Sequence, residues 1–240
     1  MKLLVIMATY NEIENINEIV PAIFNNIPEN AELLVIDDSS PDGTGKAVEE
    51  LQKNADFGKR INLVYRPGKQ GVATAALLGY KWGMERDFDV FCNIDADFSH
   101  KPEYLPKLYE TIQTYDIAIG SRNVKGGGIE NRSLLRNILT KWGCLYSRLV
   151  LGVPVQDFTG GYNMYRKSAL EKIGLDNIQA LGYAFQIEMK TRAYKNGCTM
   201  KEIPIIFPDR VKGVSKIEKG IFFEALKIVW VIRKNVKKTL

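Results

Sequence analysis

The sequence predicts an α/β fold in which helices cover both faces of a mostly parallel sheet. In the first half of the 240-residue chain, apolar runs of strand length alternate with segments whose apolar residues recur at i, i+3 and i+4. Such a β-α-β-α order is typical of parallel strands that are buried on both faces. Polar residues directly follow the apolar runs, and ligands of open α/β sheets bind beyond the carboxyl ends of the strands.

The elements of the first half follow from this periodicity. Strands are expected in the five apolar runs, at residues 3–7, 33–36, 62–65, 90–94 and 117–119. Helices are expected in the four segments between them, at residues 12–26, 44–54, 72–85 and 102–114. Pro21 should bend or divide the first helix, because proline lacks an N–H donor and its ring crowds the preceding turn.

The second half predicts a mixed order of elements after the glycine-rich loop at residues 126–128. The expected elements are a helix at 134–149, short strand-like pieces within 156–165, a helix at 184–195, a strand at 200–207, a polar loop at 208–220 and an amphipathic terminal helix. We therefore expect one α/β domain at residues 1–220 and a basic amphipathic helix at residues 221–240.

The composition, with 45% hydrophobic and 25% charged residues, is that of an ordinary globular protein. The three cysteines are odd in number and widely separated, so the sequence implies neither a disulfide framework nor a structural zinc site. A reducing cytosol fits this pattern. No run approaches the ~20 apolar residues that span a bilayer, and the apolar N-terminal run is too short for a signal peptide. Secretion and membrane spanning are therefore not expected.

The C-terminal tail is the basic part of the chain, with eight Lys or Arg residues against two Glu between residues 212 and 240. Its last twenty residues mix Phe, Trp, Leu and Ile with these cations, a composition suited to a membrane interface that carries anionic headgroups. A core helix with a basic outer edge is the alternative. Nucleic-acid binding is not expected, because base-stacking motifs are absent.

Two carboxylates, Asp95 and Asp97, stand two residues apart where the fourth expected strand ends. Both can turn towards one hard cation that also bridges a diphosphate. Mg²⁺ or Mn²⁺ would neutralise the charge that builds on a departing nucleotide diphosphate. A pair of acidic residues in a solvated turn is the alternative, since an isolated D-x-D pattern is weakly specific.

A second acidic pair, Asp37 and Asp38, follows the second expected strand. Turn formation explains the next residues, Pro41 to Thr44, but it does not explain this pair. The two carboxylates would suit hydrogen bonds to ribose hydroxyls or to a base edge, as in other nucleotide sites.

Seven motifs in a fixed order resemble those of family-two glycosyltransferases, specifically the polyprenol (dolichol) phosphate mannosyltransferases. The motifs are ATYNE, IDDSSPDGT, KQGVATAALLG, IDADFSH, GSR, DFTGGYNMYR and the terminal R-x-x-G-x-S-K. The resemblance covers residues 3–231. It implies a GT-A fold, a GDP-mannose donor, a polyprenyl (dolichyl) phosphate acceptor, Mg²⁺ or Mn²⁺, and inversion at the sugar carbon to give a β-linked mannosyl phosphate lipid.

The resemblance also assigns site residues. The positions that correspond to the donor site are Ala8, Tyr10, Glu12, Ile36, Asp38, Ala75, Asp95, Ala96, Asp97, Arg210 and Lys216. The metal ligands would be Asp95, Asp97 and Ser99, and the acceptor-phosphate site would be Arg122, Arg136 and Thr140. Arg136 and Thr140 lie four apart on one expected helix face, so that with Arg122 they could hold one phosphate from two sides. Asp95, Asp97 and Arg122 are the expected catalytic residues.

A lipid phosphate changes which other side chains are needed. Its second pKa is near ~6, so it is already nucleophilic at neutral pH and needs no protein base. His100 is therefore expected to be structural. The family places Asp157 near the sugar, but we do not expect it to act as a base. Glu188 either faces the sugar or lies on a helix surface.

Departures from the family pattern leave alternatives open. Ala8 stands where many members have Pro, and Gly160 and Asn163 stand where Ser and Arg are common. UDP-glucose or UDP-N-acetylglucosamine as donor, a hydroxyl acceptor, and a nucleotide-sugar-binding scaffold without turnover remain alternatives. We expect a peripheral protein on the cytoplasmic face of the membrane, with a possible membrane-anchoring partner protein.

Overall fold

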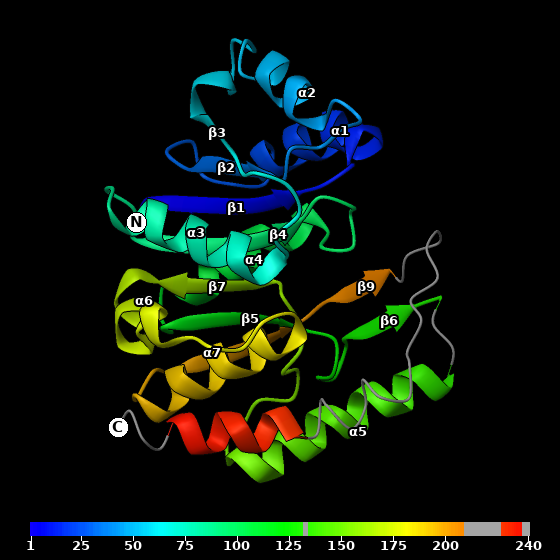
Figure 1. The fold of residues 1–240 in the computed structure, drawn as a ribbon, viewed down its shortest axis with the longest axis vertical. Helices are drawn as coiled ribbons and strands as arrows, with labels where there is room; N and C mark the ends of the chain where they lie inside the picture. Colours follow the sequence, from blue (N-terminus) through cyan, green and yellow to red (C-terminus); the bar gives the residue numbers. More distant parts are fainter. Residues whose placement is uncertain (132–133, 209–226, 237–240) are drawn as a thin grey trace.

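The computed structural model describes residues 1–131, 134–208 and 227–236, and these residues form an α/β fold (Figure 1). Its strands are β1 (Leu3–Thr9), β2 (Glu32–Asp37), β3 (Ile61–Tyr65), β4 (Val90–Asp95), β5 (Ile117–Ser121), β6 (Gly128–Glu130), β7 (Asn163–Arg166), β8 (Met200–Pro204) and β9 (Ile206–Pro208). Its α-helices are α1 (Ile13–Phe24), α2 (Thr44–Leu51), α3 (Val72–Met84), α4 (Leu105–Ile112), α5 (Leu134–Leu151), α6 (Lys167–Ile173) and α7 (Tyr183–Lys195), and a last helix covers residues 227–236. Short 3-10 turns lie at Gly58–Arg60, Pro102–Tyr104 and Leu175–Asn177.

The main sheet has seven strands among the described residues, in the order β3-β2-β1-β4-β7-β5-β8. All neighbouring pairs are parallel except the two that involve β7. The mostly parallel sheet predicted from the sequence is therefore confirmed. In the centre, Ala8 at the end of β1 stands opposite both Ile36 of β2 and Asp95 of β4.

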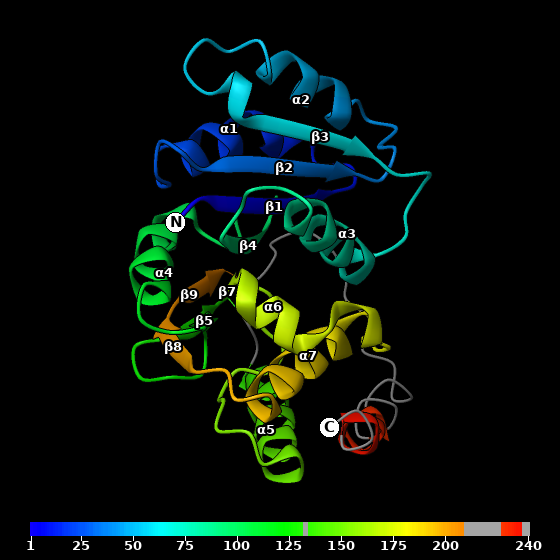
Figure 2. The same cartoon turned by 90° about the vertical axis from the view of Figure 1, so that its left-hand side faces the viewer.

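Helices cover both faces of the sheet because its strands are apolar on both faces. In β1, Leu4 and Ile6 pack into the cluster that contains α3, α6 and α7. Their neighbours Leu3, Val5 and Met7 pack into the opposite cluster, with α1 and α4. Figure 2 shows α1 and α4 on one side of the sheet and α3, α6 and α7 on the other.

Small residues let α3 lie close to the sheet. A Cβ atom on Gly79 would come within 2.5 Å of the Ile6 side chain, and one on Gly83 within 2.5 Å of Phe91. The buried face of α3 also carries three alanines, of which Ala75 is fully buried, and the fully buried Tyr80. The close approach places the N-terminus of α3 beside the carboxyl end of the sheet.

Several elements differ from the prediction. Pro21 does not divide α1, since it lies in the last turn, where its missing N–H removes a single helical hydrogen bond. The expected strand at 200–207 is interrupted at Ile205, so that β8 joins the main sheet while β9 pairs with β6. The strand-like pieces within 156–165 reduce to β7, which is antiparallel to both neighbours. The sequence analysis did not foresee β6 or α6.

The helix at residues 227–236 packs against the body of the protein, next to α5 (Figure 1). Val229, Ile232 and Val236 are buried in the same cluster as α7. Trp230 donates its indole N–H to the Tyr146 hydroxyl of α5 at 2.8 Å. The composition of the tail had suggested a membrane interface, with a core helix as the alternative. Val229 and Ile232 follow the alternative, because they pack into the core. Residues 221–226 and 237–240 lie outside the described part, and the boundary at residue 220 stays a prediction.

Candidate active site

Three loops with strained backbones stand next to one another at the carboxyl edge of the sheet. They follow β1, β2 and β4, which are adjacent strands. Each loop contains a non-glycine residue with positive φ: Asn11 at 60°, Ser39 at 53° and Phe98 at 58°. Such conformations cost of the order of 1–3 kcal/mol each and concentrate at functional sites. This edge is therefore the first candidate for the active site, as the sequence predicted.

The loop after β2 is held by both of its acidic residues. Asp37 is fully buried and accepts hydrogen bonds from the hydroxyls of Thr9, at 2.9 Å, and Ser40, at 2.6 Å. It also accepts the Ser40 N–H at 2.9 Å, so Asp37 closes the turn that follows it. The sequence analysis had found no turn role for Asp37, and these hydrogen bonds correct that view.

Asp38 forms a buried ion pair that the sequence analysis missed. Its carboxylate lies 2.6 Å from both Nε and Nη2 of Arg66, and both side chains are less than a tenth exposed. It also accepts the Gln70 N–H at 3.2 Å, and Arg66 donates to Thr74 at 2.8 Å. Asp38 thus ties β2 to the segment that leads into α3. Its predicted contact with the donor stays a prediction.

The other expected donor residues lie around this edge. Tyr10 is exposed, with the Lys69 ammonium 4.7 Å from its ring centroid. Glu12 occupies the N-cap position of α1, and its carboxylate accepts a hydrogen bond from the Asn15 side-chain amide at 2.9 Å. Ile36 and Ala75 are fully buried between the sheet and α3. The structure brings these four residues to adjacent elements, where Ala8 joins them through the register of β1.

The acidic pair lies at the end of β4 with its side chains in one loop. The Asp95 side chain is 37% exposed, and its Oδ2 lies 3.5 Å from the Ser99 hydroxyl. Asp97 Oδ1 accepts the Ser99 N–H at 3.0 Å, while Ala96 between the two carboxylates is buried. The loop therefore places both carboxylates next to Ser99, one at its hydroxyl and one at its N–H.

These side chains fit the coordination of Mg²⁺ or Mn²⁺, with a diphosphate and water as the remaining ligands. All three side chains offer oxygen, which hard cations prefer, and Mg²⁺ is usually bound through one or two carboxylates plus substrate phosphates. Within the described ranges, no group of three or more His, Cys, Asp or Glu could hold a metal ion without such help. Asp95, with its partly open carboxylate, is the residue that could reach the cation, and Asp97 and Ser99 stand beside it.

His100 is neutral and structural, as expected. Its Nδ1 accepts the Asp95 N–H at 3.1 Å, and its ring stacks on Tyr162 with centroids 4.7 Å apart. Burial lowers the pKa of His100, although the nearby Asp95 opposes the shift. The 3.6 Å approach of Nδ1 to Asp95 Oδ2 is therefore a contact of a neutral ring rather than an ion pair. His100 fixes the backbone where β4 ends.

Arg122, which follows β5, is paired with Asp157. Its Nε and Nη2 donate to the two carboxylate oxygens at 2.7 Å each, and its backbone N–H donates to Oδ2 at 2.9 Å. Nη2 also donates to the Thr159 hydroxyl at 2.8 Å. Burial would raise the pKa of Asp157, but the Arg122 guanidinium outweighs it and holds that pKa well below its usual range. Asp157 is a fixed anion beneath a fixed cation.

A pocket of about 110 Å³ joins these groups. Its lining includes Asp95, His100, Arg122, Thr159, Tyr162 and Phe207. The Phe207 ring, from β9, lies 5.7 Å from the ring of His100 and 5.4 Å from the Arg122 guanidinium carbon. Arg122, the expected acceptor-binding cation, and Asp95, an expected metal ligand, therefore line the same small cavity.

The remaining predicted residues are placed only in part. Thr140 lies in α5, and Arg136 belongs to the same helix, but the side chains of residues 134–136 are outside the described part. Arg210 and Lys216 also lie outside it. The position of these three cations relative to the pocket stays a prediction.

Glu188 is in neither of the two positions considered for it. It is buried in α7, where it forms an ion pair with Arg192 at 2.8 Å and accepts the backbone N–H of Ala180 at 2.8 Å. It therefore fixes the segment before α7. The i, i+4 spacing of Glu188 and Arg192 was the available signal, but spacing alone does not show that a helix is buried on all sides.

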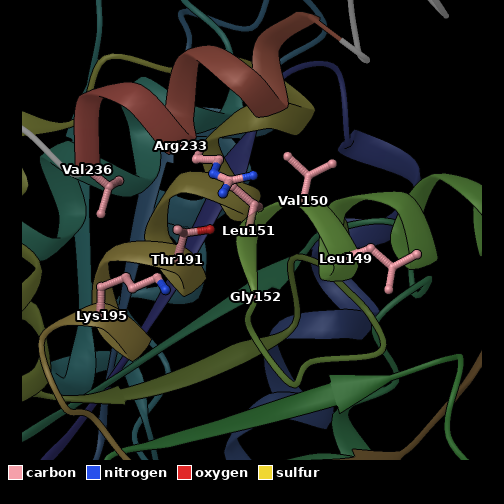
Figure 3. A pocket seen from close by; sticks show the side chains of 8 residues that line it. All are labelled: Leu149, Val150, Leu151, Gly152, Thr191, Lys195, Arg233 and Val236. Carbon is pink, nitrogen blue, oxygen red and sulfur yellow. The ribbon is translucent and has the colours of Figure 1, made fainter.

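A second pocket, of about 330 Å³, lies away from this edge, between the C-terminal ends of α5 and α7 and the helix at 227–236. Figure 3 shows Thr191, Lys195 and Arg233 reaching into it. Lys195 ends α7, where a cation compensates the partial negative charge of the helix C-terminus. None of the predicted site residues that the structure describes lines this pocket, which lies apart from the carboxyl edge of the sheet.

Comparisons with known proteins show the family of the chain. The model of the family described as "Glycosyl transferase family 2" matches residues 4–174. The polyprenol monophosphomannose synthase of Mycolicibacterium smegmatis is 43% identical over 238 residues, which cover 98% of this chain and 89% of that protein. The undecaprenyl-phosphate mannosyltransferase of Micrococcus luteus is 40% identical over 226 residues, covering 94% of this chain and 91% of that protein.

Solved structures show the same fold. The mannosyltransferase PcManGT of Pyrobaculum calidifontis, in complex with GDP-Man and Mn²⁺, aligns with a TM-score of 0.59 at 19% identity. The alignment covers 89% of this chain and 58% of that one. Because the family model spans most of the chain and two relatives align over nearly all of it, the chain belongs to glycosyl transferase family 2 and is a glycosyltransferase of GT-A fold.

Proposed function

We propose that the protein transfers mannose from GDP-mannose to the phosphate of a polyprenyl (dolichyl) phosphate, with inversion, to give a β-linked mannosyl phosphate lipid. The names of the two relatives support the sugar and the lipid phosphate. The GDP-Man and Mn²⁺ complex of the Pyrobaculum protein supports the donor and the metal. Cofactor, donor and acceptor thus agree with the chemistry of the candidate site.

One observation carries the choice of a phosphate acceptor: apart from Asp95, which we assign to the metal, the described lining of the pocket offers no general base. Asp157 has both oxygens bound to Arg122 and a pKa below its usual range. His100 uses Nδ1 to accept the Asp95 N–H, so its other ring nitrogen carries the proton. A hydroxyl acceptor needs a base, whereas a phosphate monoester is already an anion at neutral pH. The pocket instead supplies a guanidinium.

The residues then act by placement and charge. Arg122, fixed by Asp157 and Thr159, meets the acceptor phosphate as a preorganised donor. Asp95 and Asp97, with Ser99 beside them, would hold the divalent cation that binds the donor diphosphate. When bound, the cation neutralises the charge that develops on the leaving GDP. We assign Arg136 and Thr140 to the acceptor side, and Arg210 and Lys216 to the donor phosphates.

The test is a transfer assay with purified protein. Labelled GDP-mannose, UDP-glucose and UDP-N-acetylglucosamine are each offered with polyprenyl phosphate, with Mn²⁺ or with a chelator. Label should enter the lipid from GDP-mannose, and chelation should remove at least ~99% of it, because the diphosphate loses its counter-charge. Free polyprenol, which lacks the phosphate, is the matched control and should accept no sugar.

Other results would replace the proposal. Transfer from a UDP-sugar alone would change the donor, and transfer to polyprenol would require a base and a hydroxyl acceptor. Tight donor binding without any turnover would favour the nucleotide-sugar-binding scaffold.

We also propose that the protein binds the cytoplasmic face of the membrane peripherally, through α5. No helix in residues 1–131, 134–208 or 227–236 is both long enough and apolar enough to cross a bilayer. On α5, Ile138, Trp142, Leu145 and Leu149 are 50% to 74% exposed, and their spacing of four, three and four puts them on one face. An exposed apolar stripe of this kind on a helix suits insertion into the headgroup region. A membrane-anchoring protein partner is the alternative occupant of this face.

The membrane proposal is tested by sedimentation with anionic lipid vesicles. The double variant Trp142→Gln/Leu149→Gln should bind vesicles at least ~10-fold more weakly, because it removes two exposed apolar side chains. Leu78→Gln, a similar exposed change on α3, is the control and should bind as the wild type does. Equal binding of the double variant would exclude α5 as the contact.

A further inference from the structure

A fully buried lysine lies beneath the segment that carries Asp157. Lys190 has no exposed surface, and its ammonium donates to three backbone carbonyls. These belong to Asp157 at 2.8 Å, Phe158 at 3.3 Å and Gly160 at 2.9 Å. An ammonium has three N–H donors, so this arrangement satisfies all of them. A charged side chain is rarely buried without such partners.

A carboxylate on the edge strand β8 holds the same segment by its N–H groups. The two oxygens of Glu202 accept the backbone N–H groups of Gln156 at 2.8 Å and Asp157 at 2.9 Å. Lys190 therefore binds the carbonyls of the segment and Glu202 binds its amides. The two side chains come from α7 and β8, elements that are distant in sequence from residues 156–160.

The segment in turn sets the geometry of the Arg122 pair. Asp157 Oδ1 accepts the Gly160 N–H at 3.0 Å, which folds the carboxylate back over its own loop. A Cβ atom on Gly160 would lie 3.2 Å from that carboxylate, so the backbone passes close beneath it. The position of the Asp157 carboxylate, and with it the plane of the Arg122 guanidinium, depends on the shape of residues 157–160.

We propose that Lys190 and Glu202 are positioning residues, which clamp residues 156–160 so that Asp157 holds Arg122 in the acceptor pocket. The inference rests on the proposed function for the role of Arg122. Neither residue lines the pocket, so neither touches the substrate. Their removal should displace the cation that meets the acceptor phosphate and leave the donor side intact.

The kinetic test uses two variants and two controls. Lys190→Gln and Glu202→Gln should each lower kcat/KM for polyprenyl phosphate by ~10- to 100-fold, since a misplacement of about 1 Å can cost that much. The acceptor KM should rise and kcat should fall, while affinity for GDP with Mn²⁺ stays within about twofold. Lys195→Gln on α7 and Lys201→Gln on β8 are exposed neighbours and should leave both parameters unchanged.

A structural readout separates this inference from the proposed function. The amides of Arg122 and Gly160 both donate to Asp157, so their hydrogen exchange reports the pair without any substrate. Exchange at both should accelerate in the two variants and not in the controls. If the wild type failed to use polyprenyl phosphate, the proposed function would fall, but the exchange result would still decide whether the clamp exists.

The pH dependence of stability gives an independent measure for Lys190. Burial lowers its pKa from 10.5 to about 8, against the opposing charge of Asp157. Arg122, Cys144 and Glu202 also face it. The folded state then binds fewer protons than the unfolded state between pH 8 and 10.5, so stability rises with pH there. The wild type should show this rise relative to Lys190→Gln.

Defined outcomes overturn the inference. If Lys190→Gln fails to fold, the test depends on Glu202→Gln alone. This variant is expected to fold, because its amide keeps one acceptor oxygen and the side chain is only half-buried. Folded variants with wild-type acceptor kinetics and unchanged amide exchange would show that the segment holds its shape without the clamp. A loss of donor affinity equal to the loss of acceptor use would indicate general damage instead of positioning.

Discussion

Arg122→Ala should lower transfer to polyprenyl phosphate by ~10²- to 10³-fold, the usual loss when a preorganised donor is removed from a developing or bound anion. The variant should also be less stable. Asp157 has no exposed surface and would lose two hydrogen bonds from the arginine side chain and its ion pair. Breaking a buried pair by removing one partner typically costs about 3–5 kcal/mol. Transfer kinetics and urea unfolding measure the two effects.

A paired replacement separates the two effects. Arg122→Met/Asp157→Leu removes both charges of the pair, and Lys190 keeps its three backbone carbonyl acceptors, so the double variant should be more stable than Arg122→Ala. Its activity should still be as low as that of Arg122→Ala. Near-normal transfer by this double variant would show that Arg122 is structural. Lys81→Ala, which breaks an exposed pair with Asp176, is the control and should change neither quantity.

The sheet and its functional edge could be predicted because their signals are local. Each strand of the first half is an apolar run, and the polar residue that ends it follows directly in sequence. Strand register then brings Ala8, Ile36 and Asp95 side by side. Since parallel strands share one carboxyl edge, the sequence predicts that the expected donor and metal residues lie together.

Groups that stabilise the site from a distance could not be predicted in this way. Arg66 follows Asp38 by 28 residues, and Lys190 lies 33 residues from Asp157. Nothing near either cation in sequence shows that it is buried or which oxygens it meets. Lys190 and Arg192 in fact occupy a helix that is buried on nearly every side, where periodicity cannot distinguish a functional face from a core face.

The second half of the sheet was harder for a different reason. β7 is four residues long and pairs antiparallel with β4 and β5, so it interrupts the order that the first half sets. A short apolar run does not encode the direction in which a strand enters a sheet. The terminal helix shows the same limit, since its apolar residues suit a lipid surface and a protein core equally well, and Val229 and Ile232 pack into the core.

Asp95→Asn and Asp97→Asn should each reduce metal-dependent transfer by ~10³-fold or more, because each replaces an anionic ligand of the proposed cation by a neutral amide. Asparagine keeps one side-chain oxygen, so the acceptor for the Ser99 N–H can be preserved in Asp97→Asn. Both variants should therefore keep the loop geometry and the fold, and their loss of activity should come from lost metal binding.

Calorimetry of GDP binding tests whether lost metal binding causes the lost activity. Wild-type protein should bind GDP more tightly with Mn²⁺ than without it, and both variants should lose that difference while retaining the metal-independent affinity. Asp87→Asn, an exposed change just before β4 at its opposite end, is the matched control and should keep the difference. If Asp95→Asn still showed a wild-type response to Mn²⁺, the cation would have to be held elsewhere, and Arg122 would face a donor bound in another orientation.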